Sequence, residues 1–329
     1  MKNIQYIWGV KVETRKLIKF GTSSHIVSLP STWTKKNNLN KGDLIYIHEN
    51  ENSELLISAE KKEPKKEITE TTIDIDKKTR LEIKRELVAA YIQDYSLIRI
   101  IGKELQTQLK DVRTLLNQFI ALEIIEQTST KIVAQDFLNI KDASFDKIIR
   151  RIDTIIKSIL EDIGFKDKKD CYESIIIRDS DLNRLAYLGF KMIKRALKNQ
   201  QVAHELSTTP PELLNNWLMI LKLEKIGDSL KRIERNRKSL TITQKEKEHM
   251  IALYTKLKST YYEIMKAYYE NDQDAARRIA DERRKNLFDC VKFGEKYLKF
   301  RSNQVVEHFK DIHTYIGDIS RMVYLREPN

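Results

Sequence analysis

The chain has 329 residues and a formal net charge of +12, with 33% charged residues. This length allows two or three domains with cores of their own, and the positive charge favours acidic partners such as nucleic acid. Only two cysteines occur, Cys171 and Cys290, which excludes a disulfide framework or a zinc site built from cysteines. No apolar run reaches membrane-spanning length and no signal-peptide pattern opens the sequence, so we expect a cytoplasmic protein without membrane insertion.

Residues 1–60 are rich in short β-prone runs. The segment Arg15–Pro30 (RKLIKFGTSSHIVSLP) predicts two short strands around a glycine turn, followed by a small helix. After it, Leu39–Asp43 (LNKGD) predicts a turn into further strands at Leu44–His48 and Glu54–Ser58. Between Met1 and Lys66 there are 12 Lys or Arg residues against 7 Asp or Glu residues, so this region is moderately basic.

The first hairpin concentrates residues that suit contact with phosphates. Lysine and arginine attract phosphates at long range, and serine hydroxyls and backbone amides near glycine can hydrogen-bond them. The candidate DNA-binding residues are Arg15, Lys16, Lys19, Ser23, Ser24 and His25. For His25 alone, a structural role is favoured over that of a metal ligand. The alternative interpretation is a basic dimerisation module that never contacts DNA.

The run Gly21–Ser24 (GTSS), followed by Val27–Pro30 (VSLP), resembles the SpoVT-AbrB family of DNA-binding domains. The resemblance implies a swapped-hairpin β domain, an intertwined homodimer and binding to double-stranded DNA. Because a fold does not fix a function, the dimerisation-only interpretation stays open beside it.

The composition changes after residue 60. Residues 61–67 belong to a charged stretch interrupted by Pro64, which is typical of a hydrated linker. Residues 68–140 alternate between strand and helix patterns, which predicts a small two-layer α/β middle module. Its expected elements, in β-α-β-α-β order, are Thr71–Asp76, Thr79–Ile92, Ser96–Ile101, Lys110–Gln127 and Ser129–Ala134.

From residue 143 onward the pattern is almost wholly helical. Apolar residues recur at helical spacing between Phe145 and Ile163, which predicts an amphipathic helix. Further helices are expected at Leu182–Lys198, Pro211–Lys238, Gln244–Tyr269, Asp272–Tyr297 and Asn303–Arg326. The helices divide into three and three near Thr241. We therefore expect an all-α bundle of two three-helix repeats, residues 143–240 and 241–329.

The motif Leu223–Asp228 (LEKIGD) places two carboxylates on one helix face, because Glu224 and Asp228 are four residues apart. They continue an apolar row of Leu214, Trp217 and Leu221. Carboxylates within an apolar row need a charged partner or a metal, and hard oxygen ligands suit magnesium, calcium, manganese or iron. The alternative is that both lie at the solvated margin of the helix, paired with Lys225 or Arg232.

LEKIGD resembles the Glu-Arg-Ile-Gly-Asp signature of PhoU-family phosphate-signalling proteins, whose two three-helix repeats can hold metal clusters. Upstream, Arg178–Leu185 resembles the acidic start of the family's middle helix. Downstream, Asn271–Ala276 and Asp281 resemble the corresponding part of its second repeat. In the middle module, Ala121–Thr130 resembles the joining region of archaeal-type regulators that combine both domains. The resemblance to PhoU implies a divalent or iron-type metal bound by carboxylates.

Several positions depart from the PhoU pattern. Where that pattern has acidic residues or a histidine, this chain has Lys310, Thr314, Ser229 and Asn183. We therefore expect at most one metal site, built from Glu224, Asp228 and Asp179.

No catalytic motif stands out: the sequence has no glycine-rich phosphate loop, no His-Glu-x-x-His and no evidently activated cysteine, so we expect a protein that is not an enzyme. Taken together, the two resemblances imply a multidomain, homodimeric, DNA-binding transcriptional regulator of phosphate uptake. In this interpretation the bundle receives the signal. The alternative is an adaptor without DNA activity, whose bundle docks on the ATPase of a phosphate transporter or on a signalling kinase.

Overall fold

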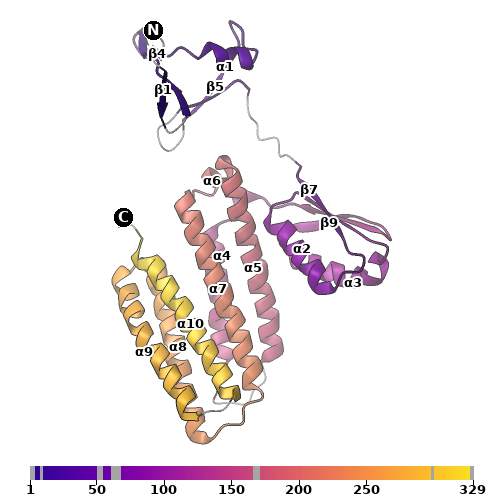
Figure 1. The fold of residues 1–329 in the computed structure, drawn as a ribbon, viewed down its shortest axis with the longest axis vertical. Coiled ribbons are helices and arrows are strands. Elements are labelled where there is room, and N and C mark those ends of the chain that lie inside the picture. The colour runs from indigo at the N-terminus through magenta and orange to yellow at the C-terminus, as the bar shows by residue number, and fades with distance from the viewer. Residues whose placement is uncertain are drawn as a thin grey trace. The chain divides into compact units, whose positions relative to one another are not determined.

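A computed structural model describes residues 4–7, 10–49, 55–60, 68–165, 171–297 and 300–326 (Figure 1). Contacts divide the chain into two compact units, Met1–Glu67 and Ile68–Asn329. The expected linker, residues 61–67, lies outside the described residues. We describe each unit by itself. Within the described residues, no helix is both long and apolar enough to cross a membrane.

The N-terminal unit is a small strand domain with one short helix. Each of its sheets is a two-stranded antiparallel pair. The pairs are β1 (Ile4–Ile7) with β2 (Val10–Glu13), β3 (Ile18–Phe20) with β4 (Ser24–Ile26), and β5 (Tyr46–Glu49) with β6 (Leu55–Ser58). Helix α1 spans Ser31–Lys36 and follows β4, as the sequence predicts. The predicted turn before β5 is also present, with the Asp43 amide donating to the Asn40 carbonyl oxygen at 3.1 Å.

The described side chains of the N-terminal unit form no cluster of buried hydrophobic residues. None of the side chains that the structure describes in this unit is buried. Both clusters of buried hydrophobic residues begin at or after Ile73, in the second unit. An isolated two-stranded hairpin is marginally stable in water, and several large apolar side chains of this unit, among them Phe20 and Leu44, are exposed.

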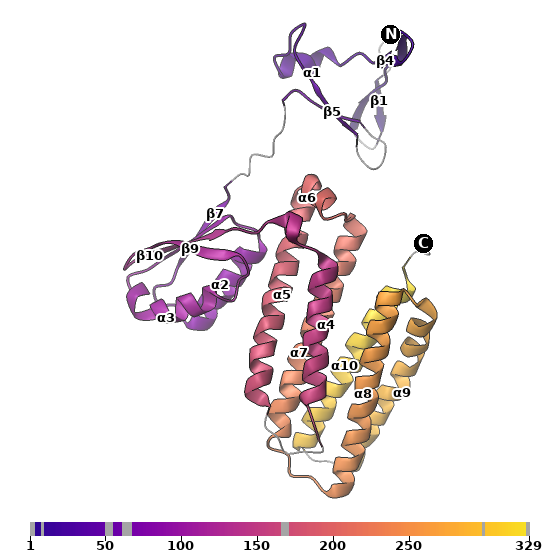
Figure 2. The same cartoon turned by 180° about the vertical axis from the view of Figure 1, so that it is seen from behind.

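The second unit opens with an α/β module. Its four-stranded sheet has the order β7-β8-β10-β9, and α2 and α3 lie on one face of it (Figure 2). In this sheet β7 runs parallel to β8, and β10 pairs antiparallel with both β8 and β9. The elements are β7 (Glu70–Asp74), α2 (Arg80–Ile92), β8 (Leu97–Ile101), α3 (Leu105–Leu116), β9 (Leu122–Gln127) and β10 (Lys131–Asp136).

The predicted helix Lys110–Gln127 is wrong in its second half. Helix α3 ends at Leu116, Ala121 adopts a left-handed backbone conformation with φ 61°, and Leu122–Gln127 forms strand β9. The strand pairs with β10 along its length, so tertiary pairing overrides the helical tendency of this stretch. The module therefore has β-α-β-α-β-β order, with one strand more than the sequence predicts.

In its described residues, the helical region contains six long helices in two groups of three. The first group is α4 (Phe145–Asp162), α5 (Tyr172–Lys198) and α7 (Pro210–Arg237), with a short α6 (Gln200–Glu205) that the sequence did not predict. The second is α8 (Gln244–Glu270), α9 (Gln273–Tyr297) and α10 (Phe300–Tyr324). Helix α5 begins ten residues before its predicted start at Leu182, so the acidic stretch Arg178–Asp181 lies inside the helix.

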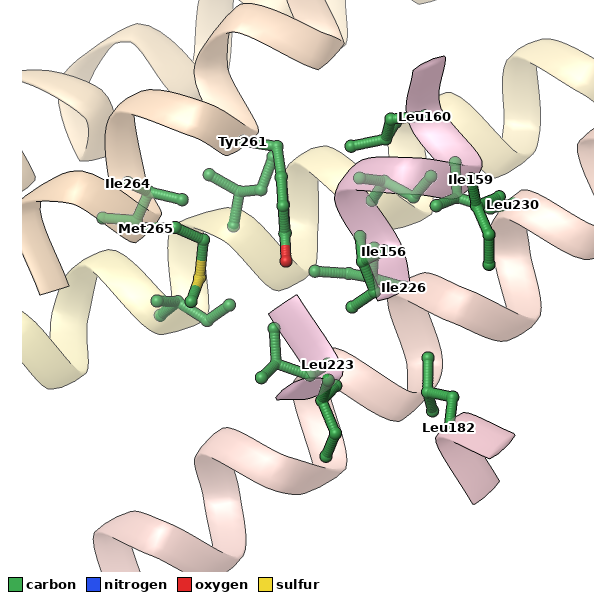
Figure 3. Close-up of a cluster of buried hydrophobic side chains, with 14 of the residues drawn as sticks. Ile156, Ile159, Leu160, Leu182, Leu223, Ile226, Leu230, Tyr261, Ile264 and Met265 are labelled. Atoms are coloured by element: carbon green, nitrogen blue, oxygen red, sulfur yellow. The ribbon is translucent and has the colours of Figure 1, made fainter. Parts of the chain in front are cut away.

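A single hydrophobic cluster runs through both groups of helices, as the side chains from α4, α5, α7 and α8 in Figure 3 show. Tyrosines of α8 join the groups by hydrogen-bonding to α4. The Tyr254 hydroxyl donates to the Leu160 carbonyl oxygen at 2.8 Å, and the Tyr261 and Tyr269 hydroxyls donate to the Asp153 carboxylate at 2.9 and 3.1 Å. The two groups are therefore one bundle rather than two separate domains.

Helices α5 and α7 approach closely at two glycines. A Cβ atom added at Gly227 would lie 2.5 Å from Cδ1 of Leu182, and one added at Gly189 would lie 2.5 Å from Cδ1 of Ile220. Carbon atoms of different side chains do not approach this closely. Both positions therefore require glycine, which has no Cβ, for the two helices to pack. The glycine of the LEKIGD motif thus has a structural role in holding α5 against α7.

Candidate nucleic-acid interface

The β3–β4 hairpin carries most of the candidate DNA-binding residues. A three-residue turn connects its strands, and Gly21 enters this turn with φ +68°, a conformation that glycine adopts without strain. Across the hairpin, Ile18 is paired with Ile26, Lys19 with His25, and Phe20 with Ser24. The glycine turn predicted from the sequence is therefore present at its expected place.

The pairing register gives the hairpin two chemically different faces. Directly paired residues share a face and successive residues alternate, so Lys19 and His25 lie together on one face. The other face carries Ile18, Phe20 and Ile26, together with Ser24. Ser24 therefore lies on the face opposite Lys19 and His25, although all three were predicted from the sequence as DNA-binding residues. One face can meet phosphates, and the other is apolar.

The remaining candidates differ in how available they are. Lys16 and Ser23 are exposed, and Ser23 lies in the hairpin turn. Arg15 is only partly exposed, and its guanidinium forms an ion pair with Glu13. Since that ion pair competes with a phosphate, Lys16 and Lys19 are the most accessible cations of the predicted set.

The sequence prediction passed over other basic residues of this unit. Lys35 and Lys36 occupy the last turn of α1, and Lys41 lies in the turn before β5; all three are exposed. These three lysines belong to no recognisable motif, so the sequence alone did not distinguish them from ordinary surface lysines.

The predicted metal site is only partly assembled. Asp179 of α5 and Asp228 of α7 come together, but they meet around a lysine: Lys231 Nζ donates to Oδ2 of Asp179 at 2.6 Å and to Oδ1 of Asp228 at 2.9 Å. Glu224 contacts only Lys225, at 3.4 Å, among the ion pairs described. Its predicted apolar row is the margin of α7 rather than the core, because Leu214 is 60% exposed.

Electrostatics support the lysine as the cation of this cluster. Burial raises the pKa of Asp179 more than the hydrogen bond from Lys231 lowers it. Burial likewise raises the pKa of Glu224. For Lys231, burial lowers the pKa, but the hydrogen bonds to Asp179 and Asp228 outweigh this and raise it. The ammonium group is therefore stabilised in its charged form between the two carboxylates.

These residues do not fit a metal ion as they are arranged. Lys231 Nζ occupies the space between the two carboxylates, and a second cation there would be repelled by it. The described part of the chain contains no group of three or more His, Cys, Asp or Glu side chains that could hold a metal. The carboxylate metal site therefore stays a prediction from the sequence.

Comparison with known proteins identifies a similar family for the N-terminal unit alone. Residues 18–68 match a family model described as "Antidote-toxin recognition MazE, bacterial antitoxin". This match begins at β3, includes both faces of the hairpin, and fits a domain of the AbrB or MazE type. The helical bundle fits a PhoU-like arrangement, but no PhoU family model matches it. No curated protein matches the chain, and neither does any solved structure.

Proposed function

We propose that the chain is a DNA-binding regulator that acts as a homodimer through its N-terminal unit. One observation carries the proposal: the β3–β4 hairpin, within the matched residues 18–68, has a basic face opposite an exposed apolar face. An exposed apolar face suits self-association, and a basic face suits binding to a polyanion.

The dimer follows from the exposed apolar residues of the N-terminal unit. Phe20 is 65% exposed and Ile18 is 58% exposed, and Leu44, Ile47 and Leu55 are exposed as well. Monomeric proteins rarely present so many large apolar side chains in so few residues. Pairing with a second copy would cover them and would place two basic faces at a fixed separation, which suits two half-sites on one duplex.

The helical region acts in this proposal as the sensor or the partner-binding module. It has a continuous hydrophobic core, and it belongs to a different compact unit from the candidate DNA-binding residues. Phosphate uptake as the regulated process enters through the likeness of LEKIGD to the PhoU signature, and no relative supports it. The proposal assigns no catalytic step to any residue.

A second candidate is the adaptor, in which the N-terminal unit only dimerises and the bundle docks on a transporter ATPase or a signalling kinase. The ion pair of Arg15 with Glu13 favours this candidate, because it removes one of the predicted phosphate contacts. The two candidates differ in whether the protein binds a duplex.

A salt titration of duplex binding by the full chain distinguishes the two candidates. The regulator predicts binding whose affinity falls steeply with salt, and Lys19→Ala should reduce the slope of log K against log salt by about 2, one phosphate contact per protomer. Lys266→Ala, which removes an exposed lysine of α8, is the matched control and should leave the slope unchanged. If the full chain binds no duplex at low salt, the regulator is rejected in favour of the adaptor.

A further inference from the structure

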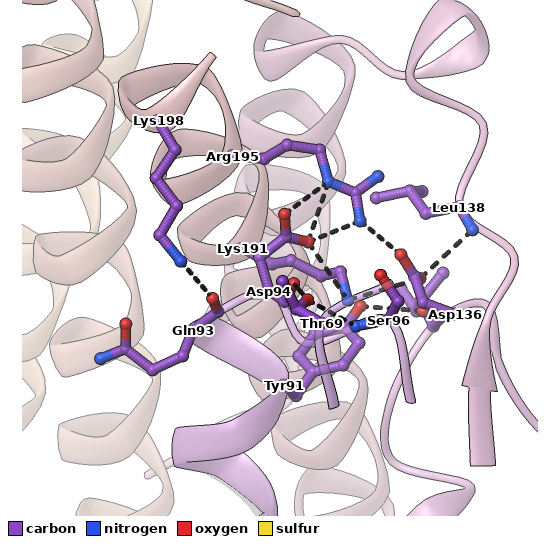
Figure 4. Close-up of polar contacts among 11 residues, drawn as sticks. Thr69, Tyr91, Gln93, Asp94, Ser96, Asp136, Leu138, Lys191, Arg195 and Lys198 are labelled. Atoms are coloured by element: carbon purple, nitrogen blue, oxygen red, sulfur yellow. Dashed lines mark hydrogen bonds and ion pairs between the residues drawn. The ribbon is translucent and has the colours of Figure 1, made fainter. Parts of the chain in front are cut away.

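A cluster of four charged side chains joins the α/β module to helix α5 (Figure 4). The acidic members are Asp94, which follows α2, and Asp136, at the end of β10; the basic members are Lys191 and Arg195 of α5. Arg195 Nε donates to both carboxylate oxygens of Asp94, at 2.8 and 2.9 Å, and its guanidinium also hydrogen-bonds Asp136. We call these four residues the junction cluster.

Lys191 is the most deeply placed member of the junction cluster. Its side chain is 0% exposed, and Nζ lies 3.4 Å from Oδ1 of Asp136 and 3.6 Å from Oδ1 of Asp94. The same Nζ lies 4.3 Å from the centre of the Tyr91 ring, within the range of a cation–π contact. Two cations and two anions balance, so the cluster is neutral as a whole. Removal of any one member would leave a buried charge without its partner.

The junction cluster is directly connected to the point where the chain enters the second unit. Thr69 precedes β7, and its hydroxyl donates to the Asp94 carbonyl oxygen at 3.3 Å. The amides of Ser96 and Leu97 donate to the Thr69 carbonyl oxygen at 2.8 and 3.0 Å, and the amide of Asp136 donates to the Ser96 carbonyl oxygen at 2.9 Å. The segment that follows the linker is thereby tied to the residues that pair with Arg195.

Helix α5 extends from the junction cluster into the bundle. It is one continuous helix of 27 residues, and it contacts α2 on the module side and α4 and α7 on the bundle side. Asp179, which Lys231 of α7 contacts, lies sixteen residues before Arg195 on this helix, about 24 Å away at 1.5 Å per residue. A shift of α5 against α7 would therefore reach the module as a rigid displacement.

We propose that the junction cluster is a latch that makes residues 68–74 move with helix α5, so that events in the bundle are transmitted to the base of the linker. The proposal does not depend on DNA binding, since it concerns only the second unit. With the latch intact, Asp94 holds residues 94–97 to α5, and Thr69 holds residues 68–74 to residues 94–97. When Arg195 is removed, these segments open independently while the two hydrophobic cores persist.

Hydrogen exchange measured by mass spectrometry on the full chain tests the latch. In Arg195→Met, peptides covering residues 68–74 and 94–97 should exchange at least about tenfold faster, because local opening governs amide exchange. Peptides from α4 and α8 should be unchanged. The control is Arg150→Met, which removes an exposed arginine paired with Asp146 on α4 and should alter neither segment.

The outcomes separate the latch from a general loss of stability. Unchanged exchange at residues 68–74 in Arg195→Met, with an intact fold, overturns the proposal. If Arg195→Met also loses protection from hydrogen exchange in α4 and α8, Arg195→Lys is the variant that tests the latch. It keeps the positive charge but lacks the planar set of guanidinium donors. Faster exchange in Arg195→Lys confined to the two segments supports the latch, and exchange equal to the unmutated protein overturns it.

Discussion

Phe20→Ser tests whether the apolar face of the N-terminal hairpin is a dimer interface. An aromatic side chain buries about 150–250 Å² when it leaves water, so the 65% of Phe20 that is exposed corresponds to roughly 130 Å². At about 25 cal/mol per Å², burial of this area in a dimer is worth about 3 kcal/mol for each protomer. A symmetric dimer buries it twice, which gives an upper limit of about 6 kcal/mol.

The measurement is the dimer dissociation constant of the full chain, from sedimentation velocity over a range of concentrations. Since every 1.4 kcal/mol is tenfold, Phe20→Ser should raise this constant by up to about 10⁴-fold. Phe288→Ser is the matched control, because Phe288 of α9 is also a phenylalanine and is 55% exposed. It lies in the unit that has its own core, so its replacement should leave the dimer constant unchanged.

The duplex titration adds a second readout to the same variant. If dimerisation brings two basic hairpins together, Phe20→Ser should weaken duplex binding although no cation is removed. A full chain that is monomeric at every concentration would refute the reasoning. So would equal dissociation constants for Phe20→Ser and Phe288→Ser, because the exposed face would then have no partner in a second copy.

Two further predictions concern the helical bundle. In thermal melts Gly227→Ala should lose about 1–3 kcal/mol of stability through its clash with Leu182, partly offset by about 1 kcal/mol of helix propensity. Gly294→Ala, where the added Cβ meets nothing closer than 3.6 Å, should instead gain stability, and a loss of equal size in both variants would contradict the packing argument. His313 is 3% exposed, and burial lowers its pKa to about 4 from 6.5. Between these pH values His313 is protonated in the unfolded chain but neutral in the folded chain. The free energy of unfolding should therefore fall by about 3 kcal/mol between pH 6.5 and pH 4. Denaturant unfolding of His313→Leu should show a smaller decrease in the free energy of unfolding at low pH. A pH profile equal to that of the unmutated protein would show that His313 is not the group responsible.

Local patterns in the sequence predicted the elements whose bounds are marked by neighbouring residues. Helix α4 agrees with its predicted range to within one residue, because its apolar spacing repeats over five turns. The glycine turn at Gly21 and the break between α7 and α8 follow in the same way from residues that are neighbours in the chain. Their positions can be read from neighbouring residues, although their stability also depends on packing.

Elements that depend on distant partners could not be predicted locally. Strand β9 is set by its pairing with β10, and its residues taken alone continue the helical pattern of α3. The junction cluster is a stronger case, since Asp94 and Arg195 are 101 residues apart. The only local indication was Lys191, a lysine within the apolar stretch Gly189–Ile193, where a charge needs a buried partner.

The LEKIGD motif shows why a motif alone did not decide the chemistry of its site. Gly227 is needed for packing against Leu182, and Asp228 is neutralised by Lys231, three residues further along the same helix. Both features are local to α7 and α5, and neither requires a ligand. The motif therefore has a structural explanation in this chain.

The two units differ in what their folding depends on. The second unit has two hydrophobic cores that are formed by residues of one chain. In the proposed homodimer, a second copy would cover the exposed apolar face of the N-terminal unit, so by mass action this unit would gain stability as the protein becomes more concentrated. In a regulator of this kind, the ability to bind DNA would rise with the amount of the protein itself, while the bundle stays folded throughout.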